Sequence, residues 1–168
     1  MTESESRIQE LVDQFRRIGQ AQMRDLPIYN ACLEVEAVGF QAFGDRWIGV
    51  LITPWFMNVI LLPSEKTPLN AKVIGQKSQE ALPVATCAFI GGGDETVGSY
   101  KSLALYSPMA AFISQGSARH EAQACLIALL TPPAELPKQA VAPILQETPQ
   151  PPPSNLSRRA FLCGRRNA

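Results

Sequence analysis

Two apolar runs in the middle of the chain restrict its possible folds more than any other feature. They extend over residues 47–53 and 56–62, and only Pro54 and Trp55 lie between them. Runs of this length, bounded by turn-forming residues, are typical of strands buried inside a sheet. Proline has no backbone amide to donate to a neighbouring strand, so Pro54 marks a bend or a bulge. The runs therefore predict two central strands with an irregular connection.

Weaker patterns on both sides of these runs predict the remaining elements. Apolar residues at three- and four-residue steps predict amphipathic helices over 6–23 and 117–130. Alternating or apolar segments predict further strands over 33–43, 84–90 and 97–106. The expected fold class is α+β, with a mainly antiparallel sheet of about five strands and helices packed on one side of it.

Three local features are expected in addition. Ser6 and Gln9 have the spacing of a capping box at the start of the first helix. The polar segment 66–82 shows a short helical stripe, which Gly75 weakens. The glycine-rich segment 91–94 is expected to form a hairpin loop, because no Gly-Lys-Ser/Thr follows it to make a phosphate loop.

A proline-rich segment divides the chain into a body and a tail. Residues 131–153 hold 8 of the 14 prolines and almost no periodic apolar pattern, which is the composition of an extended linker. We expect an α+β domain over 1–130, this linker, and a basic tail over 154–168. The tail has a net charge of +4 and the rest of the chain −4. It can fold back onto the acidic body or reach an acidic partner.

Composition and spacing also exclude several classes of function. With 15 basic and 15 acidic residues, the chain shows no general basic surface for nucleic acid. The apolar runs fall short of the roughly 18 residues of a membrane-spanning helix, and the polar N-terminus favours a cytoplasmic location. The 4 cysteines are widely separated, and the single histidine, His120, adjoins Glu121 on a helix. We therefore predict no metal site, no catalytic residues and no cofactor.

The expected break in the sheet is rich in large apolar side chains. Aromatic residues and methionine at such a break either belong to the core or form a surface groove that binds peptides or proteins. Both interpretations stay open. The candidate binding residues are Trp47, Thr53, Pro54, Trp55 and Phe56, with Pro108 and Met109 beside them.

The tail contains a second candidate site. Residues 157–162 read Ser-Arg-Arg-Ala-Phe-Leu and resemble the twin-arginine export motif, Ser/Thr-Arg-Arg-x-Phe-Leu-Lys. Export signals are N-terminal and precede an apolar stretch, so this segment does not suit export. Three interpretations stay open. The segment is a chance similarity in a basic tail, a docked final strand, or a mimic of a client's signal peptide. The candidate docking residues are Arg158, Arg159, Phe161 and Leu162.

Four ordered segments carry a family resemblance. They are residues 26–29 (Leu-Pro-Ile-Tyr), residues 47–58 with their Thr-Pro-Trp-Phe-Met core, residues 103–109 (Leu-Ala-Leu-Tyr-Ser-Pro-Met), and residues 158–164. In these segments the chain resembles the HybE/HupJ family of assembly chaperones for nickel–iron hydrogenases. The resemblance covers about residues 8–130 and the tail.

The resemblance implies a non-catalytic cytoplasmic factor that holds an immature hydrogenase subunit before export. The implied client is the small-subunit precursor with its twin-arginine signal, or else the large subunit, together with other maturation proteins. Some relatives are associated with a rubredoxin, but this chain lacks the paired cysteines of such a module. The alternative is a thiol-dependent redox or metal-handling accessory factor that uses Cys87, Cys125 or Cys163.

Overall fold

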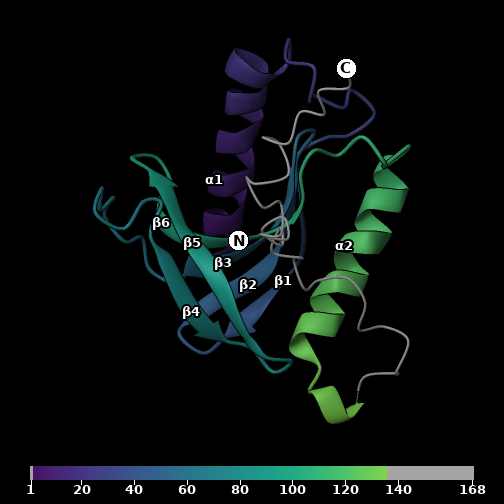
Figure 1. Cartoon of the computed structure of the whole chain (residues 1–168). Coiled ribbons are helices and arrows are strands. Elements are labelled where there is room, and N and C mark those ends of the chain that lie inside the picture. The colour runs from purple at the N-terminus through teal and green to yellow at the C-terminus, as the bar shows by residue number, and fades with distance from the viewer. Residues whose placement is uncertain (1, 136–168) are drawn as a thin grey trace, which may run out of the picture.

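The computed structural model describes residues 2–135 and contains one six-stranded sheet and two long helices (Figure 1). The sheet is antiparallel throughout, in the order β1-β2-β3-β6-β5-β4. The elements are α1 (Glu3–Ile18), β1 (Glu36–Phe43), β2 (Arg46–Ile52), β3 (Met57–Pro63), β4 (Lys77–Ala81), β5 (Thr86–Asp94), β6 (Gly98–Tyr106) and α2 (Gln115–Leu130). The expected α+β class is confirmed. The predicted tail and most of the predicted linker lie outside the described residues.

The sixth strand replaces a predicted helix. Within segment 66–82, where a helical stripe was expected, residues 77–81 form β4 and pair with β5. Gly75 has a φ of +78°, a conformation that interrupts any helix at this point. The backbone of Gly75 and Gln76 instead bonds to Gly91 on β5. The prediction of a helix here was wrong because backbone pairing with β5 outweighs a weak apolar stripe.

The two helices cover opposite faces of the sheet, whereas the sequence pattern led us to expect both on one side (Figure 1). Alternate residues of β2 point to opposite faces. Ile48 and Val50 join a core with Ala122 of α2, while Leu51 joins a second core with Leu11 of α1. An apolar side chain on each face of β2 requires a cover on each face. The protein is therefore a three-layer structure with the central strands buried on both sides.

The sheet is strongly curled. In a flat sheet, β2 and β4 would lie about 19 Å apart, because three strands separate them in the sheet order. Nevertheless Arg46 on β2 donates a hydrogen bond to the carboxylate of Glu80 on β4 at 2.7 Å. Lys101 of β6 binds the other oxygen of the same carboxylate. The curl brings these three charged side chains together on the concave side of the sheet.

Two local predictions are corrected. The capping box is formed by Thr2 and Glu5 instead of Ser6 and Gln9, so the first helix begins earlier than expected. Its helical turns continue to Met23 through a short π-helical segment. The glycines at 91–93 lie inside β5 and not in a loop. A Cβ at Gly91 would lie 2.0 Å from the carbonyl oxygen of Val73, so the close approach of a neighbouring loop requires glycine here.

Candidate functional site

The connection between β2 and β3 is a tight turn organised by one buried threonine. The hydroxyl of Thr53 accepts hydrogen bonds from the amides of Phe56 at 2.9 Å and Trp55 at 3.3 Å. It donates to the carbonyl oxygen of Phe56 at 3.1 Å. The backbone amide of Thr53 also donates to that carbonyl, at 2.8 Å. These bonds fix the bend that Pro54 predicted and determine where the two following aromatic side chains lie.

The aromatic residues of this turn pack beneath the surface, on the α1 side of the sheet. Trp55 is only 7% exposed, and the ring of Phe56 lies edge-on to Phe15 of α1, with centroids 5.5 Å apart. The ring of Tyr29 stacks on Trp55 at 6.2 Å with an interplanar angle of 22°. Tyr29 belongs to the loop after the first helix. The turn therefore supports that loop from below.

Asn30 joins three loops at this point. Its backbone amide donates to the carbonyl oxygen of Pro54 at 2.8 Å. Its side-chain amide donates to the carbonyl oxygens of Met109 at 3.0 Å and Phe112 at 2.8 Å, and its side-chain oxygen accepts from the amide of Cys32. The segments 26–29, 53–57 and 107–109, which are far apart in the sequence, are thus held together.

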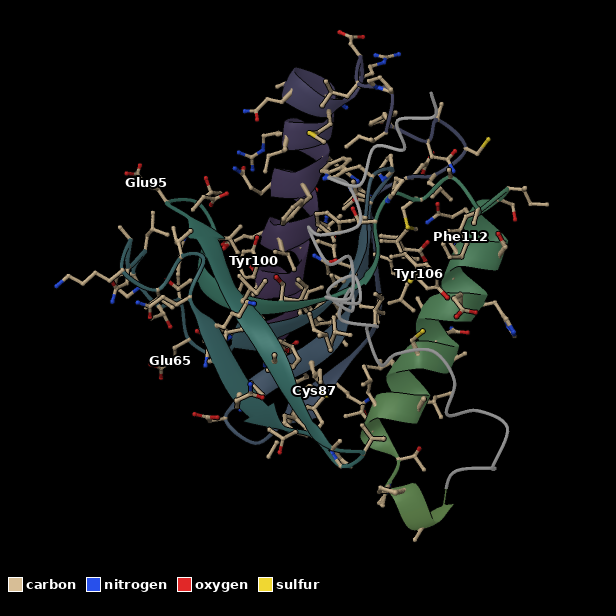
Figure 2. The ribbon with its side chains drawn as sticks, in the orientation of Figure 1. Glu65, Cys87, Glu95, Tyr100, Tyr106 and Phe112 are labelled. Carbon is tan, nitrogen blue, oxygen red and sulfur yellow. The ribbon has the colours of Figure 1, made fainter. Side chains whose placement is uncertain are left out.

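An open groove of about 520 Å³ lies between the loop at 27–32 and the loop at 108–113. Its walls are mainly apolar, and two of its side chains are unusually accessible, since Ile28 is 44% and Ile113 is 85% exposed. Phe112 forms part of one wall and meets Tyr106 edge-on at 5.1 Å; Figure 2 shows these two rings together beside α2. An exposed apolar groove with a rigid frame is typical of a protein-binding site.

Polar contacts fix the second wall of the groove to the sheet. At the start of α2, Gln115 donates to the carboxylate of Glu36 at 2.6 Å and accepts from the backbone amide of Glu34 at 2.9 Å. Arg119 donates to both oxygens of Glu36 at 2.7 and 3.1 Å, which holds the pKa of Glu36 below its usual value. The hydroxyl of Tyr106 donates to Glu121 of α2 at 2.8 Å.

Two exposed carboxylates flank the lining loop 27–32 in the sequence. Asp25 precedes the lining loop and Glu34 follows it. Within residues 2–135, neither side chain makes a hydrogen bond or an ion pair, in contrast to Glu36 and Glu80. Neither residue is among those that line the groove. Two accessible negative charges therefore flank the lining loop in the sequence, and Arg24 adds a positive charge next to Asp25.

The predicted binding residues fall into two groups in the structure. Pro108 lines the groove, and Met109 lies buried behind it. Thr53, Pro54 and Trp55 are buried below the groove, and Trp47 and Phe56 are partly buried in the α1-side core. Their role in binding stays a prediction. Sequence reasoning missed Asn30, whose hydrogen bonds reach distant backbone groups and leave no local pattern, and Ile113, the last residue of a short apolar segment. The docking residues Arg158, Arg159, Phe161 and Leu162 lie outside the described residues.

Cys87 and Cys125, two of the three cysteines that the structure describes, are poorly suited to thiolate chemistry. Burial and the nearby carboxylate of Glu121 raise the pKa of Cys125 to about 12, and burial raises that of Cys87. A high pKa disfavours the thiolate, which is the reactive and metal-binding form. Among residues 2–135, no three His, Cys, Asp or Glu side chains are grouped in a way that could hold a metal ion. Cys32 is exposed at the groove, and Cys163 lies outside the described residues.

The sequence of this chain matches a known protein family. The family model for the NiFe-hydrogenase assembly chaperone HybE matches residues 6–164 of this chain. The match includes the body, the proline-rich segment and most of the basic tail. The chain belongs to the HybE family. Members of this family are assembly chaperones of nickel–iron hydrogenases, as the resemblance of the four segments implied.

Individual relatives support this placement. The chain is 36% identical to the hydrogenase expression/formation protein HupJ of Bradyrhizobium diazoefficiens, over 92% of this chain and 85% of that one. It is 38% identical to the probable rubredoxin HupJ of Rhodobacter capsulatus over 74% of this chain, but the match spans only 45% of that longer relative. The solution structure of HybE from Escherichia coli is similar, with a TM-score of 0.58 at 27% identity, covering 95% of this chain and 90% of that one.

In the part of the chain that the structure describes, no helix is both long enough and apolar enough to cross a membrane. Within residues 2–135, both long helices have 16 residues, fewer than a helical span across a bilayer requires.

Proposed function

We propose that this HybE-family chain binds the small-subunit precursor of a nickel–iron hydrogenase through the precursor's twin-arginine signal, in the cytoplasm and before export. The groove between the loops at 27–32 and 108–113 is the proposed contact. The observation that carries this proposal is the exposed apolar groove, whose lining loop is flanked in the sequence by the accessible carboxylates of Asp25 and Glu34. The proposed role is non-catalytic: the chain holds its client and does not transform it.

The chemistry of the signal matches the chemistry of this groove. A twin-arginine signal joins two adjacent arginines to an apolar stretch. Arginine binds carboxylates through a fork of N–H donors, which Asp25 and Glu34 can accept at the two ends of the lining loop. The apolar stretch can lie against Ile28 and Ile113, whose exposed area is lost from water on binding.

The rigidity of the groove also suits a chaperone. Asn30 and the start of α2 fix both walls, so the loops lose little freedom when a client binds. The groove is small compared with a standard protein–protein interface. It is therefore expected to bind with modest affinity, which allows the client to leave for export.

The test is a binding assay of the purified full-length protein with the small-subunit precursor in three forms: signal intact, twin arginines changed to lysines, and signal deleted. We expect the strongest binding for the intact signal, weaker binding for the lysine form, and loss of binding on deletion. Lysine keeps the charge but lacks the bidentate fork, so its loss of affinity separates specific recognition from simple attraction. Equal capture of all three forms would place the contact on the folded subunit instead.

The chain offers a matched pair of variants for the same assay. Asp25→Asn with Glu34→Gln removes both carboxylates that flank the lining loop and is expected to weaken binding about fivefold, the size of two exposed ion pairs. Glu65→Gln with Glu95→Gln removes two exposed carboxylates that lie across the molecule from Phe112 (Figure 2). This control should bind like the wild type. Equal losses of affinity in both variants would show that net charge alone causes the effect.

The thiol-dependent alternative is tested separately. Replacing all 4 cysteines by serine or alanine should leave client binding intact if the chain acts as a chaperone. Loss of function in a variant that still folds would favour a redox or metal-handling role. If the chain captured the large subunit alone, the large subunit would be the client, and the family of the chain would stay the same.

A further inference from the structure

We propose that the basic tail of this same chain competes with the client for the groove, and that residues 158–162 are the competing segment. The inference rests on the proposed function, because it assumes that the groove accepts a twin-arginine sequence. It adds a form of regulation: the groove is occupied by the chain's own tail until a client signal displaces it.

The tail has the chemistry that the groove accepts. Arg158 and Arg159 are followed by Phe161 and Leu162, which repeats the order of an arginine pair and an apolar pair in a signal peptide. The groove offers apolar walls with Ile28 and Ile113 accessible, and two exposed carboxylates, Asp25 and Glu34, flank its lining loop in the sequence. The body of the chain has a net charge of −4 and the tail +4, so long-range attraction also favours docking.

The tail is long enough to reach the groove. The groove lies at the start of α2, and the described chain continues past the other end of this helix, which is about 24 Å long. The 22 residues between Glu135 and Arg158 can span about 68 Å at the rise of an extended proline-rich segment. That span is more than twice the length of the helix. Docking within one chain is therefore geometrically possible.

Tethering makes even a weak contact effective. A segment on a short linker has an effective concentration in the millimolar range, so a tail with sub-millimolar affinity would occupy the groove most of the time. If the tail occupies it about 90% of the time, the apparent affinity for a client falls about tenfold. A client signal with a longer apolar stretch than Phe161 and Leu162 would still displace the tail.

Two native cysteines allow a direct test of this contact in the full-length protein. Cys32 is exposed on the wall of the groove, and Cys163 directly follows Leu162. Mild oxidation with diamide, followed by non-reducing mass spectrometry, should give a disulfide between Cys32 and Cys163 within one chain. Cys87 lies on β5, toward the other end of the sheet from Phe112 in Figure 2, and serves as the internal control. Arg158→Glu with Arg159→Glu should reduce the yield.

Several outcomes would overturn the proposal. They are the absence of a Cys32–Cys163 disulfide, an equal yield of a Cys87–Cys163 disulfide, and a disulfide formed only between two chains. A Cys32–Cys163 yield that the double substitution in the tail does not lower would have the same meaning. Each would mean that the tail does not dock in the groove of its own chain.

A second measurement separates this inference from the proposed function. A synthetic twin-arginine signal peptide should bind the Arg158→Glu, Arg159→Glu chain about tenfold more tightly than the wild type. Equal affinity for both chains would refute competition by the tail and leave the groove as the client site. Failure of the peptide to bind either chain would refute the proposed function, and the cross-link alone would then decide whether the tail docks.

Discussion

The backbone amide of Asn30 donates a hydrogen bond to the carbonyl oxygen of Pro54 at 2.8 Å. This bond connects the loop after the first helix to the turn between the two central strands. Because the side chain of Asn30 also reaches Met109 and Phe112, a single residue aligns both walls of the groove with the most buried part of the sheet. The shape of the groove is therefore tied to the stability of the core.

Asn30→Ala is expected to lower the free energy of unfolding by about 2 kcal/mol, because it leaves backbone groups of three residues without their partner. Urea denaturation followed by tryptophan fluorescence measures this loss. Hydrogen exchange should also increase at 108–113. Asn70→Ala is the control, since the side chain of Asn70 accepts only a local bond from the amide of Lys72. Equal losses in the two variants would contradict the linking role of Asn30.

Thr53→Val tests the turn that supports the groove. Valine fills nearly the same volume but removes the hydroxyl that bonds to Trp55 and Phe56. We expect a loss of about 2 kcal/mol in the free energy of unfolding, since the turn amides are buried. Thr53→Ser keeps the hydroxyl and should lose about 1 kcal/mol or less. If the serine variant were the less stable of the two in urea titrations, packing of the methyl group would outweigh the hydrogen bonds.

Much of the fold could be predicted from sequence periodicity, and the failures have physical causes. The runs at 47–53 and 56–62 identify the central strands because burial on both faces leaves few polar positions in them, namely Thr53 and Asn58. Burial on both faces also requires a helix on each face, which the expected one-sided arrangement does not provide. The strand at 77–81 has no apolar pattern, because its place at the sheet edge depends on backbone bonds to β5.

The candidate site was only partly predictable. Trp55 and Phe56 marked the right region, but the fold buries them below the groove. The groove itself depends on Asn30, whose partners are backbone carbonyls of a distant loop. Side chain to backbone bonds over such a separation leave no trace in local spacing. Ile113 ends a short apolar segment before a helix, and its place on a groove wall is evident only from the position of the loop at 27–32.

The charged cluster on the concave side of the sheet predicts a pH dependence. Burial raises the pKa of Glu80, but hydrogen bonds from Lys101 and Arg46 outweigh it, so the pKa lies below the usual 4.5. A depressed pKa in the folded state stabilises the fold above pH 4.5, and this contribution is lost as the pH falls through the folded-state value. Glu80→Gln should thus cost about 2 kcal/mol at pH 7 and less at pH 3.

Urea titrations of both proteins at the two pH values measure this difference. Glu65→Gln, at an exposed carboxylate, is the control and should have little effect at either pH. A loss for Glu80→Gln that is as large at pH 3 as at pH 7 would show that the glutamine disturbs packing instead of removing an ion pair.

The described thiols should differ sharply in reactivity. With a pKa of about 12, Cys125 carries a thiolate fraction of about 10⁻⁴ at pH 8, and it is also buried. Cys32 is exposed. Timed alkylation with iodoacetamide at pH 8, read by mass spectrometry, should modify Cys32 in the native protein and leave Cys125 intact until urea is added. Rapid native alkylation of Cys125 would revive the thiol-dependent alternative.

The apolar contribution of the groove is tested by one pair of isoleucines. Ile113 lies on the groove wall and is 85% exposed, while Ile127 lies near the far end of α2 and is 66% exposed. Ile113→Glu should weaken binding of the small-subunit precursor at least tenfold, because burial of an isoleucine contributes about 2 kcal/mol. Ile127→Glu makes the same chemical change outside the groove and should bind normally. Since both side chains are exposed, both variants should keep wild-type stability in urea. Wild-type affinity in both variants would place the client contact outside the groove. An equal loss of affinity in both variants would place it on the outer face of α2.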